Sequence, residues 1–246
     1  MKRRPFPERH DHPVGVDLSS AVTVLLAGTG SDDVYVRRVF GTALAEAGAV
    51  LVTPQPDPRR LVSGYLEALD DAARHGPIAV GGISLGAAVA AHWACEHQRT
   101  ALAVLAALPA WAGEPGDAPA ALSARHTAAQ LRRHGLEEVT AAMQASSPAW
   151  LADELSRSWR RQWPQLPDAM EQAASYCSPT PAELGRLHVP MAVVGALDDP
   201  IHPIAVARLW AASAPRAALR TITLEEFGPA PELLGAACLA ALASVE

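Results

Sequence analysis

The sequence has few cysteines, and their placement removes two classes of protein. Its 246 residues include three cysteines, Cys95, Cys177 and Cys238. They are odd in number and far apart, so their spacing fits neither a disulfide framework nor a metal site. We expect reduced thiols buried on helices, and no bound metal.

Basic clusters and long apolar runs are also missing. Lys and Arg total 20 against 26 Asp and Glu, a net charge of −6, and no basic cluster of useful size occurs beyond residues 2–4. Nucleic acid is therefore not an expected partner. The basic start is not followed by the apolar segment of a signal peptide, and no stretch reaches the roughly 18 apolar residues of a membrane span. We expect a cytoplasmic protein with a small-molecule ligand and no membrane association, its oligomeric state left open.

What the sequence has in quantity is apolar residues, half of the total, in short runs that alternate with helical patterns. Such runs, each followed by a helix, predict a mostly parallel α/β sheet of about six strands, covered on both faces. The strands are expected at residues 21–26, 50–52, 78–80, 102–105, 191–194 and 219–224. Helices are expected at residues 33–47 (with Ser31 or Asp32 as N-cap), 59–75, 87–95, 204–212 and 231–243.

Residues 112–187 interrupt this alternation, because they carry helical patterns and no strand. Four helices are expected there, at residues 118–133, 136–144, 148–163 and 168–176. We therefore divide the chain into an N-terminal extension (1–20), a core (21–111 and 188–246) and a helical lid (112–187). Four tryptophans lie in or beside the lid: Trp111, Trp150, Trp159 and Trp163. They either face an apolar substrate or attach the lid helices to the core.

The most informative motif follows the strand at residues 78–80. Its sequence is Gly81-Gly82-Ile83-Ser84-Leu85-Gly86, and an Ala-rich helical stretch comes next. Gly-x-Ser-x-Gly between a strand and a helix is typical of a nucleophile elbow, a turn so sharp that small residues must flank the serine.

With this motif in this place, the chain resembles the α/β-hydrolase fold family from about residue 21 to the last helix. The resemblance implies that Ser84 is the nucleophile and that no cofactor is needed. It also implies an oxyanion hole formed by the backbone amides of Leu85 and of Thr29, in the segment Ala27-Gly28-Thr29-Gly30. Residues 28–30 could instead be an ordinary turn. A dinucleotide site is not expected, because Asp33 takes the third glycine position of that fingerprint.

The family's acid follows the strand after the lid, here in the segment Gly195-Ala196-Leu197-Asp198-Asp199-Pro200-Ile201-His202-Pro203. In the family, this acid commonly stands in a Gly-x-x-Asp setting with a proline a few residues later. The distance to Pro203 selects Asp199, which we prefer, whereas the spacing from Gly195 selects Asp198. Both carboxylates could instead cap the helix that follows. In the same way, Asp32 and Asp33 could repel anionic substrates or simply cap the first helix.

The base is missing from its expected place, because no histidine follows His202 and the family's chain order puts the base after the last strand. His202 could serve, since it lies three residues after Asp199. A histidine of the lid, His126 or His134, is a second possibility. In the third, no base exists, and the pocket binds or senses a ligand or carries out a reaction that needs an oxyanion hole more than a nucleophile.

Two functions are therefore expected. The first is a serine hydrolase acting by acyl transfer on a small apolar ester, thioester or amide, with Ser84, His202 and Asp199 as its catalytic residues. The second is a catalytically silent binding or regulatory protein on the same fold.

Overall fold

The computed structural model describes residues 16–246, and its centre is a six-stranded sheet. The strands are β1 (Val22–Leu26), β2 (Val50–Val52), β3 (Ile78–Ile83), β4 (Ala101–Ala107), β5 (Met191–Ala196) and β6 (Ala217–Ile222). They run in the order β2-β1-β3-β4-β5-β6, and every neighbouring pair is parallel. The prediction of a parallel sheet of about six strands is confirmed.

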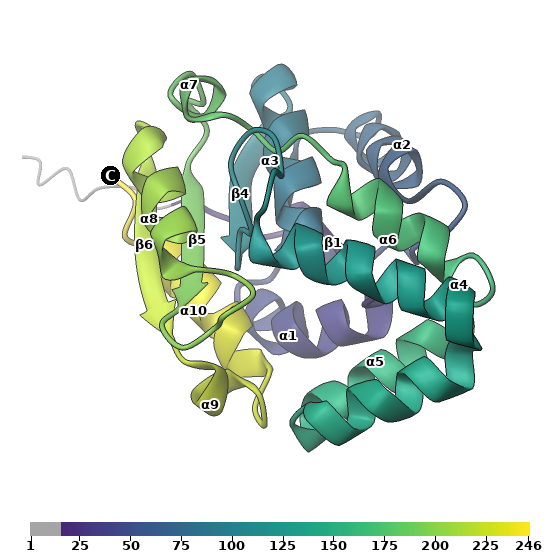
Figure 1. Cartoon of the computed structure of the whole chain (residues 1–246). Helices are drawn as coiled ribbons and strands as arrows, with labels where there is room; N and C mark the ends of the chain where they lie inside the picture. Colours follow the sequence, from purple (N-terminus) through teal and green to yellow (C-terminus); the bar gives the residue numbers. More distant parts are fainter. Residues whose placement is uncertain (1–15) are drawn as a thin grey trace, which may run out of the picture.

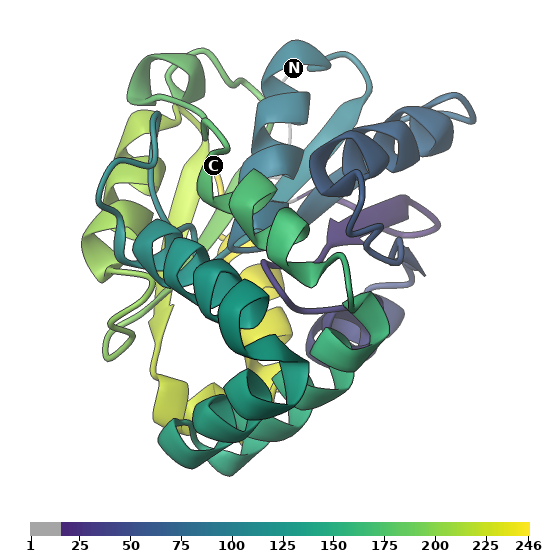
Figure 2. The same cartoon turned by 45° about the vertical axis from the view of Figure 1, so that its right-hand side comes forward.

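Helices cover both faces of the sheet (Figures 1 and 2). They are α1 (Asp33–Glu46), α2 (Leu61–Ala73), α3 (Leu85–Glu96), α8 (Ile204–Ser213) and α10 (Glu232–Leu242). The crossover from β1 to β2 runs in one direction along the sheet, and the crossovers after β2 run in the opposite direction. Because such connections are right-handed, α1 lies on one face of the sheet and α2, α3 and α8 lie on the other face. α1 and α10 pack side by side on one face. The central strands β3 and β5 are buried throughout, as expected of a sheet covered on both sides.

The segment between β4 and β5 is helical; its three longer helices lie together, and a short fourth helix lies apart from them beside α8 (Figure 1). They are α4 (Pro119–Ser146), α5 (Ala149–Gln162), α6 (Leu166–Ala174) and the short α7 (Pro181–Leu184). α4 is broken at Gly135, where φ is 78° and ψ is 175°, between the first two helices expected from the sequence. The helices α4, α5 and α6 share a small apolar core of their own, which includes Trp111, Leu131 and Trp159. Their role as a lid stays a prediction.

Three details differ from the sequence-based expectations. β3 continues through the two glycines to Ile83, because its backbone stays paired with β4 there. The last strand stops at Ile222, since Thr223 caps an unexpected short helix, α9 (Leu224–Phe227), through a capping box with Glu226. Cys177 is exposed and lies between α6 and α7, so the expectation of three cysteines buried on helices is wrong for it.

Most of the expected N-terminal extension, together with its basic residues 2–4, lies outside the described residues. Across residues 16–246, no helix is both long enough and apolar enough to cross a bilayer.

Candidate active site

A one-residue turn at the end of β3 carries Ser84. β3 ends at Ile83 and α3 begins at Leu85, so Ser84 alone reverses the chain. Its φ of 54° and ψ of −114° form a backbone conformation that residues other than glycine rarely adopt. Such strain persists only where the surrounding structure enforces it, and it is concentrated at functional sites.

The two glycines of the motif explain how this turn is enforced. A Cβ atom on Gly82 would lie 2.3 Å from the carbonyl oxygen of Leu26, and one on Gly86 would lie 2.2 Å from the same atom. The end of β1 therefore passes against the turn more closely than any side chain allows. The Ser84 amide also donates to the carbonyl of Ala107, at 2.9 Å, which ties the turn to the end of β4.

The loop after β1 lies beside Ser84. A Cβ atom on Gly28 would come within 3.4 Å of the Ser84 Cβ, so the loop and the turn are in close approach. Leu85 is the first residue of α3, and its amide has no acceptor within the helix. Within residues 16–246, neither this amide nor that of Thr29 donates a hydrogen bond. Both amides are therefore available as hydrogen-bond donors, which the expected oxyanion hole needs.

His202 and Asp199 come from one loop after β5 and form a chain of hydrogen bonds with Ser84. The Nε2 atom of His202 lies 3.0 Å from the Ser84 Oγ, and its Nδ1 atom lies 2.7 Å from the Asp199 Oδ2. The other carboxylate oxygen, Oδ1, accepts from the amides of Ile201 at 2.7 Å and His202 at 3.1 Å. Asp199 therefore shapes the loop and orients the imidazole at the same time.

The electrostatics of the pair fix which nitrogen carries the proton. Burial alone would raise the pKa of Asp199, but the hydrogen bond and charge of His202 and the two backbone amides outweigh it, so the pKa lies below its ordinary value. An ionised carboxylate only accepts hydrogen bonds, so Nδ1 of His202 must carry the hydrogen. In the neutral ring, Nε2 is then free to accept the hydroxyl proton of Ser84.

The remaining candidates lie elsewhere. Asp198 is exposed, and its Oδ1 accepts from the Leu224 amide at 2.6 Å, so it supports α9 and does not contact His202. His126 and His134 lie on α4 at the wall of the same cavity, without a hydrogen bond to Ser84. The Nδ1 atom of His134 is 3.1 Å from Glu138 instead.

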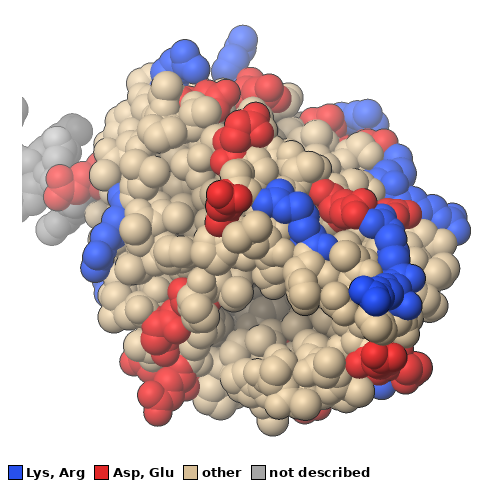
Figure 3. Space-filling view, in the orientation of Figure 1, with Lys and Arg blue, Asp and Glu red and all other residues tan. Residues whose placement is uncertain are grey.

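Ser84, His202 and Thr29 open into a cavity of about 1160 Å³ between the sheet and helices α4 and α5. Figure 3 shows its mouth as a hollow in the face of the molecule seen in Figure 1. The volume is slightly above the usual range for small-molecule sites, roughly 300–1,000 Å³. The wall is mainly apolar, with Met143, Trp150, Leu151, Leu155, Trp159 and Met170 among its residues. Trp159 lines the cavity and also belongs to the apolar core of the inserted helices, so the two alternatives for the tryptophans do not exclude each other, and contact with a substrate stays a prediction.

An ion-pair network joins α5 to the start of α1, beside this cavity. The carboxylate of Asp32 is buried and contacts Arg157 at 2.8 Å and Arg161 at 3.2 Å. Glu154 of α5 forms ion pairs with Arg38 and Arg157. Burial opposes ionisation of Asp32, but the two arginines and a backbone amide outweigh it and hold its pKa below the ordinary value. Asp32 is the N-cap of α1 and does not line the cavity.

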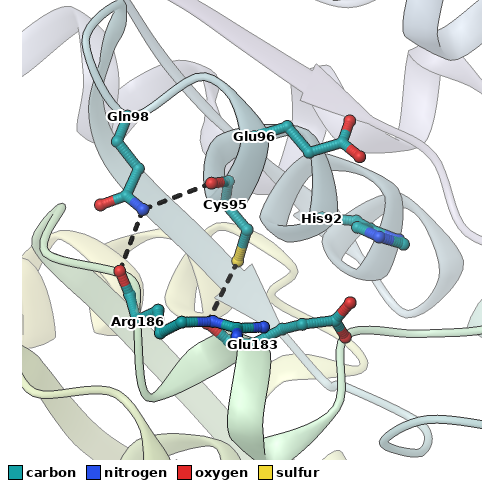
Figure 4. Close-up of a pocket in the computed structure, with 6 residues that line it drawn as sticks. All are labelled: His92, Cys95, Glu96, Gln98, Glu183 and Arg186. Carbon is teal, nitrogen blue, oxygen red and sulfur yellow. Dashed lines mark hydrogen bonds between the residues drawn. The ribbon is translucent and has the colours of Figure 1, made fainter.

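A second, smaller cavity of about 320 Å³ lies between α3 and α7 (Figure 4). It is lined by His92, Cys95, Glu96, Gln98, Glu183 and Arg186. Burial, with a contribution from Glu183, raises the pKa of the Cys95 thiol to about 11, so this thiol is a poor nucleophile. Within residues 16–246, no group of three or more His, Cys, Asp and Glu side chains could hold a metal ion.

Comparison with solved structures decides the fold. The chain is similar to a putative non-heme bromoperoxidase from Mycobacterium tuberculosis (19% identity, TM-score 0.68, 93% of this chain and 94% of that one). It is also similar to a thermophilic esterase from Thermogutta terrifontis (16%, 0.67, 92% of each) and to the enol-lactonase of Burkholderia xenovorans (16%, 0.64, 89% and 85%). The chain has the α/β-hydrolase fold.

No family model and no curated protein matches the sequence. The assignment of the α/β-hydrolase fold therefore rests on the similarity to solved structures. Sequence reasoning missed the part of the site formed by α9, where Leu224 and Phe227 line the cavity. The available signal was the pair Thr223 and Glu226, a Thr-x-x-Glu capping box that marks a helix start.

Proposed function

We propose that the protein is a serine hydrolase that cleaves small, mostly apolar esters, thioesters or amides by acyl transfer through Ser84. The single observation that carries the proposal is the continuous chain from Ser84 Oγ to His202 Nε2, at 3.0 Å, and from His202 Nδ1 to Asp199, at 2.7 Å. A hydroxyl near neutral pH is a weak nucleophile until a neighbouring base takes its proton. This chain of hydrogen bonds supplies that base, His202, in the tautomer whose Nε2 atom can accept the hydroxyl proton.

In the proposed reaction, the Ser84 oxygen attacks the substrate carbonyl while His202 takes the hydroxyl proton. The amides of Thr29 and Leu85 donate to the developing oxyanion, and each such donor contributes roughly 3–4 kcal/mol to lowering the barrier. His202 then returns the proton to the leaving group, leaving an acyl ester on Ser84. Water, activated by the same imidazole, releases the acid and restores the serine.

The alternative, a catalytically silent binding protein on the same fold, rested on the absence of a histidine after the last strand. The position of His202 removes that motive, because an imidazole lies within hydrogen-bond distance of the serine. The apolar cavity suits a bound ligand and an acyl substrate equally, so it does not favour the silent protein.

The experiment combines turnover and labelling. The protein is assayed with 4-nitrophenyl esters of graded acyl length and, separately, with a fluorophosphonate that labels activated serines. Ser84→Ala should lose both signals while keeping the wild-type circular dichroism and melting temperature. Ser123→Ala, which changes another serine of the same cavity, is the matched control and should keep both.

If the wild type neither hydrolyses any ester nor takes up the label, although it is folded, the hydrolase proposal fails. The proposal also fails if Ser84→Ala retains the wild-type rate.

A further inference from the structure

The wall of the Ser84 cavity has an uneven charge composition. Among the described residues that line it, none is Lys or Arg, whereas four are acidic: Glu138, Glu154, Asp199 and Glu225. We propose that this site selects acyl substrates without a negative charge and discriminates against those carrying a carboxylate or a phosphate. This inference rests on the proposed function and names the substrate class within it.

The arginines of the ion-pair network beside the cavity are already paired with carboxylates. Arg157 and Arg161 on α5 both contact Asp32, and Arg38 and Arg157 pair with Glu154. None of the three lines the cavity, and moving one toward a bound anion would take an ion-pair partner away from a buried carboxylate, Asp32 or Glu154. The network therefore consumes the positive charge that an anionic substrate needs.

The polar groups of the wall do not replace that charge. α4 presents His126, Gln130 and His134 to the cavity at intervals of four residues, which places them on one face of the helix. The glutamine is neutral, and a histidine carries a charge only when it is protonated. His134 is next to Glu138, so even its protonated ring already has a counter-ion.

The approach to the cavity has the same character. Figure 3 shows the hollow rimmed mainly by uncharged residues, with no Lys or Arg at its opening. A charged group that enters a largely apolar cavity loses its hydration, and this cost is recovered only when a partner of opposite charge is present. Neutral acyl groups lose little hydration and gain apolar contacts.

The test compares three 4-nitrophenyl esters that have the same reacting carbonyl. They are the hexanoate, the monoester of adipic acid, which ends in a carboxylate, and the methyl-capped adipate, which has the added polar atoms without the charge. At about pH 8, we expect kcat/KM for the carboxylate to be at least ~100-fold below that of the methyl-capped ester. The hexanoate and the methyl-capped ester should differ by less than ~10-fold.

A variant pair then tests the stated cause. Gln130→Arg adds a cation to the cavity wall from a half-buried position on α4, outside the hydrogen-bonded chain of Ser84, His202 and Asp199, and Gln130→Met is the uncharged control of similar length. The arginine should narrow the ratio between methyl-capped and carboxylate esters by roughly 10-fold, while the methionine leaves it unchanged. Each ratio is measured within one variant, so a change in that variant's overall turnover cancels from the comparison.

The outcomes separate the two proposals. If no ester is hydrolysed and no fluorophosphonate is bound, the proposed function fails. If the neutral esters are hydrolysed and the carboxylate ester is hydrolysed equally well, the hydrolase stands and the charge selection is wrong. A large ratio that Gln130→Arg leaves unchanged contradicts the missing cation as its cause.

Discussion

Asp198 and Asp199 are adjacent, and exchanging each for asparagine separates the proton-transfer chain from the structure of its loop. In Asp199→Asn, the side-chain oxygen can still accept from the amides of Ile201 and His202, so the loop keeps its shape. An amide NH2 group, however, replaces the oxygen that lies 2.7 Å from the His202 Nδ1.

The consequence follows from the tautomer. An NH2 group donates, so Nδ1 must become the acceptor and the ring hydrogen moves to Nε2. Nε2–H then faces the Ser84 oxygen, at the 3.0 Å contact, and cannot take its proton. Loss of the correct tautomer in a serine triad lowers kcat by about 10⁴. We therefore expect a loss of 10³- to 10⁴-fold, or roughly 4–5.5 kcal/mol in activation free energy.

The assay is turnover of the best neutral 4-nitrophenyl ester, with melting temperatures measured in parallel. Asp198→Asn is the control, because its oxygen can still accept from the Leu224 amide. It should keep kcat within about 3-fold and lose at most ~1 kcal/mol of stability. The opposite result, an inactive Asp198→Asn beside an active Asp199→Asn, would refute the assigned chain. So would near-wild-type rates in both.

Two further predictions concern stability. Asp32→Asn should lower the free energy of unfolding by about 3 kcal/mol at neutral pH, since it uncouples a buried carboxylate from Arg157 and Arg161. The pKa of Asp32 is lower folded than unfolded, so its stabilisation exists above the unfolded value of 3.8 and is lost as the pH falls through the folded value. The gap between wild type and variant in urea unfolding should therefore close below that pH, and a constant gap argues against the ion pairs. Gly86→Ala should lose roughly 3 kcal/mol or more, or fail to fold, because its Cβ would meet the Leu26 carbonyl oxygen at 2.2 Å. Gly41→Ala in α1, with no atom within 4 Å of its Cβ, should gain about 0.5–1 kcal/mol; equal effects in the two glycine variants contradict the close approach.

The sheet and its helices could be predicted because their signals are local. Apolar runs such as those at residues 78–80 and 191–194 have no polar face, which is typical of a strand covered on both sides. The Gly-x-Ser-x-Gly spacing reports a backbone constraint, the close approach of β1 to the turn, so it identifies the turn without knowledge of any distant residue. Strand ends were less certain, because periodicity alone does not distinguish Ile222, in β6, from Leu224, in α9.

The partners of Ser84 depend on contacts between distant parts of the chain. His202 is 118 residues from the serine, and its sequence neighbourhood fits a surface loop equally well. The choice between Asp198 and Asp199 depends on which carboxylate turns inward, and this is set by the position of Leu224 beyond β6. The charge balance beside the cavity could not be predicted either, because Asp32 pairs with Arg157 and Arg161, and Glu154 with Arg38, only across more than 100 residues of sequence.

The segment after β6, where the chain order of the fold predicts a base, has a different use in this protein. Phe227 and Leu224 line the cavity there, and Phe227 packs against Trp150 of α5 with ring centroids 6.1 Å apart. A Cβ atom on Gly228 would lie 2.3 Å from the Trp150 ring nitrogen, so the inserted helices rest directly on this segment. An imidazole here would put a polar group into that apolar contact. In the proposed triad, a base next to the acid leaves this contact apolar, and the one carboxylate of Asp199 both shapes its loop through Oδ1 and orients the His202 imidazole through Oδ2.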